Sequence, residues 1–345
     1  MKIIKPSYSI INESDINKKI ERVARVCYKS EDMITEGSSV RMVKNLLKRQ
    51  HTAMLEHASI AVCVDFKLLK LLKNTLDNLN TVIQKNDSKS LKRNYLRYST
   101  RNADTDTARY IVSGNIRAWY EAFTILNDYE YALPVIIKDE FAKIAPGIFD
   151  DFNYTNSFYI EDYDKFKIIN NFKFEIITDF SILSSEEKMI HEDVSVLFTV
   201  DRGVTHEMVR HRDCSFAQES TRYCNYSLGK YNNEITVIEP CFIEKDSDKY
   251  NIWKQGCEQA EQTYFQMIES GIQAQGARSV LPTSVKADIV MTANLREWKH
   301  ILNLRACDST GPAHPQIKEI MVPLLKEFKQ KYCFEFQDLE ISENN

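Results

Sequence analysis

A cluster of cationic side chains is the feature of this sequence best suited to chemistry. Arg210, His211 and Arg212 are consecutive, Ser220 follows after seven intervening residues, and Arg222 lies two positions further on. A guanidinium group stays charged when it is buried, and its planar N–H groups match phosphate and imide oxygens. The cluster therefore indicates a site for an anionic ligand. The alternative is a solvated basic turn at the C-terminal end of a helix, where positive charge interacts favourably with the helix dipole.

The complete pattern resembles the signature of flavin-dependent thymidylate synthases, in which Arg-His-Arg is followed by seven residues, a serine, one residue and an arginine. Other segments resemble the same family: His51 and Glu56-His57 before a strand, Arg278-Ser279-Val280-Leu281-Pro282, Asn294-Leu295-Arg296, Asn303-Leu304-Arg305-Ala306, and His314-Pro315-Gln316-Ile317-Lys318-Glu319-Ile320. These segments lie within residues 1–66 and 191–335. The resemblance favours a catalytic domain made of these two parts, with residues 67–190 as an insertion that carries no readable motif.

The resemblance assigns ligand contacts to particular side chains. It implies that FAD is contacted by Cys27, His51, Arg210, His211, Arg212, Gln218, Asn294 and His300. It implies that dUMP is contacted by Glu207, Arg210, Gln218, Ser220, Arg222, Arg278 and Arg305, with Arg278 reaching the site from a neighbouring subunit. Arg305 is the implied catalytic residue, because its positive charge would favour negative charge developing on the uracil ring and make C5 more nucleophilic.

The resemblance also implies a reaction and an assembly. A flavin-dependent thymidylate synthase methylates dUMP to dTMP. Its carbon comes from 5,10-methylenetetrahydrofolate and its hydride from reduced FAD, tetrahydrofolate is released, and NADPH reduces the flavin again. Members of the family are homotetramers with sites built from several subunits, so a homotetramer is expected. Some positions depart from the family pattern, namely Cys27, Glu207, Ala217, Gln218 with Glu219, and His300.

Composition limits the classes of protein to which the chain can belong. Its 345 residues are 43% hydrophobic and carry a net charge of −4, whereas a nucleic-acid-binding protein usually has a basic surplus. The net charge therefore argues against nucleic acid as a partner. No apolar run reaches the ~18 residues of a membrane span, so a membrane is not an expected partner either. The eight cysteines include no Cys-x-x-Cys pair, so we expect no metal site and reduced thiols in a cytoplasmic protein.

The order of predicted elements indicates the fold class. Helices are predicted over residues 14–50, 67–96 and 205–212, and strands over residues 58–64, 194–200 and 285–292. A helix is also predicted from Asn294, with Glu297 three residues on as in a capping box, and another from His314, with Pro315 at its first turn. Strands and helices alternate without a strict β-α-β rhythm, which favours an α+β fold. The resemblance adds a mixed, largely antiparallel sheet flanked by helices. Residues 128–193 are predicted to be mostly solvated, and residues 336–345 to be a polar tail.

Some features leave alternatives open. Residues 112–119 (VSGNIRAW) resemble residues 291–298 (MTANLREW), which indicates either an internal duplication or chance similarity of two strand-to-helix turns. Ser220 lacks the Gly-x-Ser-x-Gly context of an activated nucleophile, so it is interpreted as a ligand-binding residue. One competing hypothesis for the whole chain is a small RNA- or nucleotide-binding module that uses the arginine-rich loop. Another is a folded but inactive relative in which the insertion has made a binding or regulatory protein.

Overall fold

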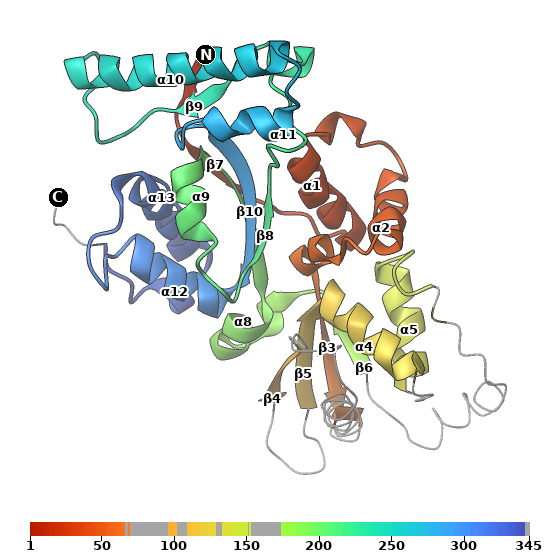
Figure 1. Ribbon diagram of the computed structural model, residues 1–345. Helices are drawn as coiled ribbons and strands as arrows, with labels where there is room; N and C mark the ends of the chain where they lie inside the picture. Colours follow the sequence, from red (N-terminus) through yellow and green to blue (C-terminus); the bar gives the residue numbers. More distant parts are fainter. Residues whose placement is uncertain are drawn as a thin grey trace, which may run out of the picture. The chain divides into compact units, whose positions relative to one another are not determined.

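The fold is that of a computed structural model, which describes residues 1–65, 68–69, 96–101, 109–128, 133–150, 152 and 174–341 (Figure 1). The chain forms two compact units. Unit 1 comprises Met1–Ile11, Val23–Met33 and Val194–Asn345, and unit 2 comprises Asn12–Arg22 and Ile34–Asp193. The boundaries of these units differ from those of the predicted domains. Residues 34–66, which were predicted to belong to the catalytic domain, lie in unit 2 together with the predicted insertion. The division into a catalytic domain and an insertion at residues 67–190 stays a prediction.

The sheet of unit 1 has the strand order β2-β7-β10-β8. Its strands are β2 (Ser7–Ile10), β7 (Asp193–Asp201), β10 (Lys286–Asn294) and β8 (Ser215–Gln218). β2 is antiparallel to β7, and β8 is antiparallel to β10. A separate parallel pair is formed by β1 (Lys2–Ile4) and β9 (Thr236–Ile238). Seven consecutive residues of β10 are buried, so this central strand is covered on both faces.

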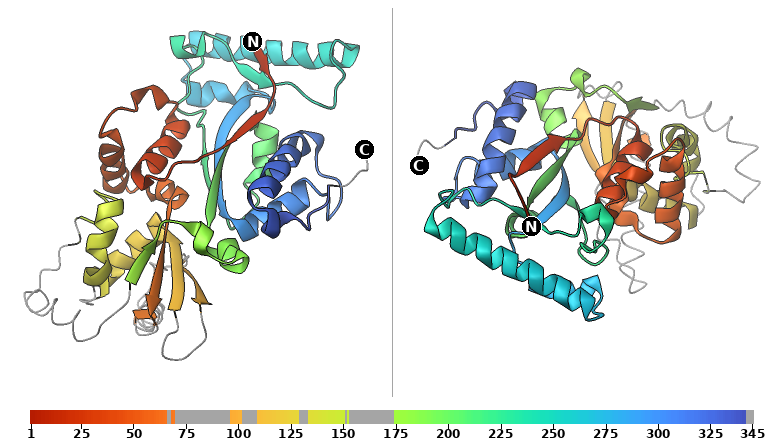
Figure 2. Two further views of the ribbon diagram at one scale, coloured as in Figure 1. Left: turned by 180° about the vertical axis from the view of Figure 1, so that it is seen from behind. Right: turned by 90° about the horizontal axis from the view of Figure 1, so that it is seen from above.

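Helices and short 3-10 turns make up the rest of the regular structure of unit 1. They are the second half of α1 (Ile16–Tyr28), α9 (Arg202–Met208), α10 (Asp248–Glu269), α11 (Ala274–Ala277), α12 (Leu295–Arg305), α13 (Pro315–Lys331) and α14 (Cys333–Phe336), with 3-10 turns η1 (Glu31–Met33), η4 (Gly229–Tyr231) and η5 (Arg278–Val280). α12 and α13 lie side by side on one face of the sheet (Figures 1 and 2). Within the predicted polar tail, Phe336 and Leu339 are buried, and Phe336 packs edge-on against Phe328 of α13.

Unit 2 contains a second four-stranded sheet, with the order β4-β5-β3-β6 and all neighbours antiparallel. Its strands are β4 (Arg97–Arg101), β5 (Arg109–Asn115), β3 (Ser59–Asp65) and β6 (Phe174–Ile177). The helical elements are α2 (Ser38–Lys48), η2 (Thr52–His57), α4 (Ile116–Asp128), α5 (Leu133–Ile144), η3 (Phe180–Ile182) and α8 (Ser185–His191), with the first half of α1.

Unit 2 has an aromatic core of its own. Trp119, Phe123, Phe141 and Phe149 are almost completely buried. The rings of Trp119 and Phe141 are 5.0 Å apart at their centroids and perpendicular, and those of Phe123 and Phe149 are 5.2 Å apart, both within the preferred range for aromatic pairs. The prediction of a mostly solvated segment at residues 128–193 is therefore wrong for the described residues around Phe141 and Phe149.

Most predicted elements are present with altered ends. The α+β class with largely antiparallel sheets is confirmed. The helix predicted over residues 14–50 is two helices, since α1 ends at Tyr28 and α2 begins at Ser38 after Gly37, whose φ of 68° is in the left-handed region. The helix predicted over residues 67–96 falls almost entirely outside the described residues. All eight cysteines have free thiols. Among the described residues, no helix is long and apolar enough to cross a membrane.

Candidate active site

The arginine cluster lies in a turn immediately after α9. Asp201 ends β7 and caps α9, because its side chain accepts a hydrogen bond of 2.9 Å from Val204 N. The helix ends at Met208, and His211 N donates to Met208 O at 3.1 Å. The helix predicted to reach residue 212 is thus four residues too long. The early end turns Arg210 and Arg212 outward as exposed side chains, whereas His211 is 8% exposed.

Helix α12 brings Arg305 to this turn. Asn294 ends β10 and caps α12, since its side-chain oxygen accepts a hydrogen bond of 2.9 Å from Glu297 N; the predicted cap is confirmed. Arg305 is the last residue of α12. Its Nη1 donates to Glu207 Oε2 at 2.9 Å, and its Nε donates to His211 Nε2 at 3.3 Å. Glu207 of α9 and the turn that follows therefore fix the orientation of the Arg305 guanidinium group.

His211 is a neutral imidazole in this arrangement. Burial lowers the pKa of His211 to about 4, and Coulombic interactions with Arg305 and then with His300 add to the effect. The hydrogen bond from Arg305 requires a lone pair on Nε2 of His211, so the proton of the neutral ring is on Nδ1. The low pKa and the hydrogen bond have the same consequence: the ring carries no charge at neutral pH.

Two hollows meet at Arg305. The first has a volume of about 480 Å³ and is lined by Arg210, His211, Arg212, Asp213, Glu297, His300, Leu304 and Arg305. The second has a volume of about 370 Å³ and is lined by Leu304, Arg305, Thr310, Gly311, Pro312 and Ala313. The sequence did not mark Asp213, Glu297 or residues 310–313 as site residues. A signal for the last group was present, because Gly311-Pro312 marks a turn, and Gly311 adopts a φ of 121°.

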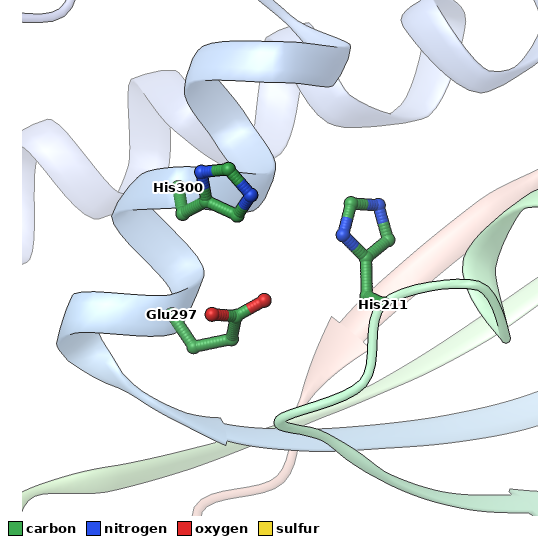
Figure 3. A group of neighbouring side chains, drawn as sticks. All are labelled: His211, Glu297 and His300. Carbon is green, nitrogen blue, oxygen red and sulfur yellow. The ribbon is translucent and has the colours of Figure 1, made fainter.

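The first hollow contains a compact set of possible metal ligands. One ligand atom from each of His211, Glu297 and His300 lies within 4.8 Å of the others (Figure 3). The rings of His211 and His300 are edge-on, with centroids 6.3 Å apart. Burial raises the pKa of Glu297. Arg305, however, donates to His211 Nε2 and places a permanent positive charge beside the set, which disfavours a second cation there.

The segment containing Ser220 and Arg222 forms a partly exposed turn after β8. Ser220 N donates to Cys27 O at 3.2 Å, which joins the turn to the end of α1. Arg278 Nη1 donates to Thr221 Oγ1 at 3.3 Å, so Arg278 lies beside this turn within the same chain. The guanidinium carbon of Arg222 is 5.7 Å from the ring centroid of Tyr223. The turn therefore gathers three of the residues that the resemblance assigns to dUMP.

A buried ionic network holds this turn on the sheet. Lys286 Nζ donates to Glu219 Oε2 at 2.7 Å and to Asp288 Oδ2 at 2.8 Å. Lys29 also donates to Asp288. Burial opposes the charged form of Asp288, yet Lys286 and Lys29 hold its pKa below the usual value. Glu219, 2% exposed, occupies a position where the family pattern has glutamine; the two lysines compensate the extra buried charge.

Other predicted site residues have different environments. Gln218 Nε2 donates to Thr205 Oγ1 at 3.0 Å, so its amide contacts α9 and lines neither hollow. His51 is the N-cap residue of η2, in unit 2. Burial, followed by the neighbouring Cys224, raises the pKa of Cys27 to about 11, so its thiol is neutral at physiological pH.

Comparisons with known proteins agree with the signature. Residues 176–332 match the family described as thymidylate synthase complementing protein. The flavin-dependent thymidylate synthase of Pyrococcus abyssi is 37% identical over 130 residues, which are 38% of this chain and 51% of that protein. The enzyme of the same name from Corynebacterium aurimucosum is 29% identical over 158 residues, covering 41% of this chain and 60% of that protein. The chain spans about half the length of the relatives that it matches.

Residues 176–332 are thus similar to flavin-dependent thymidylate synthases over the segment that carries the signature. The matched segment contains Glu207, the arginine cluster, the Ser220 turn, Arg278 and the whole of α12, whereas Cys27 and His51 lie outside it. A crystal structure of the UMP/dUMP methylase PolB from Streptomyces cacaoi, bound with 5-Br UMP, has 19% identity and a TM-score of 0.35, covering 42% of this chain and 73% of that one. The sequence similarity to flavin-dependent thymidylate synthases lies in unit 1 and in the last elements of unit 2.

Proposed function

We propose that this chain is a flavin-dependent thymidylate synthase that methylates dUMP to dTMP, with FAD as bound cofactor and 5,10-methylenetetrahydrofolate and NADPH as co-substrates. The observation that carries the proposal is the position of Arg305 between two hollows of about 480 and 370 Å³. A reaction between a flavin and a nucleotide needs two adjoining binding places, and a fixed charge between them would stabilise charge that develops on the nucleotide. One guanidinium group that lines both places meets this need.

The first hollow suits a flavin. The ring system of a flavin is planar and aromatic, and its pyrimidine end presents carbonyl oxygens and ring nitrogens. The neutral ring of His211 and the donor groups of Arg210 and Arg212 complement these features without a buried, unpaired cation. Bound FAD would supply the hydride, chemistry that no side chain provides. His300 and Asn294 are the further residues that would contact it.

Arg305 would act on the nucleotide by electrostatics. A guanidinium has five N–H groups, so the pairs with Glu207 and His211 leave the same group able to donate to a ligand. Its charge would stabilise negative charge that develops on the uracil ring. Glu207 and His211 hold the guanidinium in place beforehand, so little reorganisation is needed during the reaction. Ser220, Arg222 and Arg278 would bind the phosphate of dUMP.

The assay that tests this proposal combines a spectrum with product formation. The purified chain is expected to be yellow, with a flavin band at about 450 nm, and to form dTMP from dUMP, 5,10-methylenetetrahydrofolate and NADPH. Arg305→Ala should lower the rate by about 100-fold or more and leave the flavin band unchanged. Arg305→Lys, the matched control, keeps the charge and should retain more activity. A colourless protein that does not take up added FAD would refute the proposal.

Complementation tests the same proposal in a cell. The chain should restore growth of a thymidine auxotroph without added thymidine, and Arg210→Ala should restore it poorly, because Arg210 would contact both FAD and dUMP. Equal growth with the wild-type chain and with Arg210→Ala would remove this arginine from the site. The expected homotetramer is measured separately, by sedimentation of the purified chain with and without dUMP.

A further inference from the structure

The two sheets have the same internal plan. In unit 1, β7 and β10 are central neighbours, β8 lies at the edge beside β10, and β10 leads directly into α12. In unit 2, β3 and β5 are central neighbours, β4 lies at the edge beside β5, and β5 leads directly into α4. In each unit the edge strand precedes its central neighbour in the chain. β3, β4, β5 and α4 therefore correspond to β7, β8, β10 and α12.

The strand registers agree residue by residue. Arg97, the first residue of β4, is opposite Ser113, which lies two positions before Asn115. Ser215, the first residue of β8, is opposite Thr292, which lies two positions before Asn294. Because pairing register fixes which face each side chain occupies, equal registers place corresponding side chains on corresponding faces. This agreement is independent of the sequence similarity between residues 112–119 and 291–298.

Two specific hydrogen bonds recur at the corresponding turns. Asn115 accepts from Ala118 N at 2.8 Å, as Asn294 accepts from Glu297 N at 2.9 Å. The indole of Trp119 donates to Ile60 O at 3.1 Å, and that of Trp298 donates to Val194 O at 2.9 Å. Both carbonyls are near the start of the corresponding strands β3 and β7. A buried indole that reaches across to one particular strand carbonyl is not a general property of strand-to-helix turns.

The ends of these strands also correspond. Asp65 accepts from Leu68 N at 2.8 Å, and Asp201 accepts from Val204 N at 2.9 Å. Each aspartate is the last residue of its strand and precedes a helical segment. β7 has nine residues and β3 has seven, so the strands differ by two residues in length. Both nevertheless accept an indole hydrogen bond near their start and end in an aspartate that accepts a backbone hydrogen bond.

Each sheet is completed by a strand from the beginning of the other copy. β2 precedes β3 in the chain but pairs with β7, placing Tyr8 opposite Phe198 and Ile10 opposite Val196. β6 precedes β7 but pairs with β3, placing Phe174 opposite Val64 and Ile176 opposite Val62. The first strand of each copy thus lies in the sheet of the other. Such reciprocal exchange is the topology of domain swapping, here within one polypeptide.

We propose that unit 2 is a diverged second copy of the strand-and-helix unit that carries the candidate site, and that the two copies exchange their first strands. In this proposal one flavin and one dUMP bind per chain, at unit 1. The single-site part of this inference rests on the proposed function. It replaces the interpretation of residues 67–190 as an insertion, since β4, β5 and α4 of that segment are the counterparts of β8, β10 and α12.

The second copy has not kept the residues of the site. When α4 is aligned on α12 through Asn115 and Trp119, Ala118 stands at the position of Glu297, Glu121 at that of His300, and Leu126 at that of Arg305. Arg117, at the position of Arg296, is instead paired with Glu56 and Glu121 at 2.7 Å each. The counterpart helix therefore provides neither the guanidinium group nor the imidazole that line the first hollow.

The stoichiometry of bound flavin tests the single-site part. FAD released by denaturation is measured against the concentration of the full-length chain after saturation with FAD. A ratio near one supports the inference, and a ratio near two overturns it while the proposed function stands. A ratio near zero overturns the proposed function and the single-site part together. As a matched pair, His300→Ala should lower the occupancy at limiting FAD, and Glu121→Ala, its counterpart in unit 2, should not.

A cross-link tests the exchange of first strands independently of any ligand. Cys63 of β3 is directly opposite Glu175 of β6, and directly opposite residues have Cβ atoms about 4.5–5.5 Å apart, close to the span of a disulfide. Under mild oxidation Glu175→Cys should form an intrachain disulfide with Cys63, found by mass spectrometry of a non-reduced digest. The exposed control Thr178→Cys, outside β6, should not form it.

Two outcomes of the cross-linking would overturn the exchange. One is a disulfide between two chains, which would mean that β6 pairs in another molecule. The other is the same yield of the Cys63 disulfide from both variants. Hydrogen exchange of the unmodified chain provides a test that does not depend on the folding of a variant. The amides of residues 7–10 and 174–177 should be protected from exchange. Rapid exchange of both segments would contradict the pairing.

Discussion

Replacing His211 by glutamine is expected to make unit 1 less sensitive to acid. His211 is 8% exposed, its pKa is lowered to about 4 mainly by burial, and its Nε2 accepts a hydrogen bond from Arg305 Nε. Glutamine keeps an oxygen that can accept from Arg305 but has no group that titrates between pH 4 and 7. The variant therefore separates the proton uptake of this site from its hydrogen bonding.

The size of the effect follows from the two pKa values. As pH falls through 6.5, the unfolded chain takes up a proton at His211 that the folded chain does not take up until about pH 4. This contribution is fully present above pH 6.5 and is lost as pH falls toward 4. At about 1.4 kcal/mol per pKa unit, this one residue lowers the free energy of unfolding by about 2 kcal/mol between pH 7 and pH 5, and by about 3 kcal/mol in total.

Urea unfolding at pH 7 and pH 5 measures this difference. The chain has three tryptophans, and Trp119→Phe leaves Trp253 and Trp298, both in unit 1, as fluorescent reporters. In that background, the loss of stability from pH 7 to pH 5 should be about 2 kcal/mol smaller with His211→Gln than with His211 present. The exposed His206→Gln is the control and should follow the parent. Equal losses with and without His211 would refute the assignment of a buried neutral imidazole.

Three further predictions concern single side chains. Lys29→Met should destabilise unit 1 by about 2 kcal/mol, because it removes a charged donor from Asp288. The same variant should raise the KM for dUMP, because the Ser220 turn is held less firmly. An unchanged unfolding curve and an unchanged KM would contradict these two expectations. Arg212→Ala should lower FAD retention on dialysis, and full occupancy would remove it from the flavin site. Asn294→Ala should cost about 1 kcal/mol through loss of the α12 cap, whereas Asn294→Asp, which keeps the acceptor, should cost less in the same urea titration.

The elements that position the site were predictable because their signals are local. Asn294 with Glu297 predicts the start of α12, and Pro315 predicts the start of α13; both helices begin there. The end of α9 was not predictable, because the sequence between Met208 and Arg212 has neither glycine nor proline. The helix stops there as His211 turns inward to meet Arg305, a partner 94 residues away in sequence. A tertiary contact of this kind overrides local propensity.

Within the candidate site, the sequence indicated the residues with distinctive chemistry and missed the supporting ones. Arg305, His211 and Glu207 form one hydrogen-bonded group, and all three were predicted site residues. Glu297 lines the same hollow but was interpreted only as part of a helix cap. The ionic network around Asp288 gave no sequence signal, because Lys29 and Asp288 are 259 residues apart and only the fold brings them together.

The proposed second copy illustrates what a ligand-binding motif cannot reveal. A ligand-binding motif specifies side chains that contact a ligand, so a copy that has lost Arg305 and His300 retains no such motif. Strand pairing imposes weaker demands: an apolar alternation, a capping residue, and an indole that needs a buried acceptor. Only these demands are met at Asn115 and Trp119. In this proposal β2 and β6 each complete the sheet of the other copy, so neither copy is continuous in sequence. The similarity of residues 112–119 and 291–298 left chance open as an explanation, and the matching registers and caps are what favour a repeat.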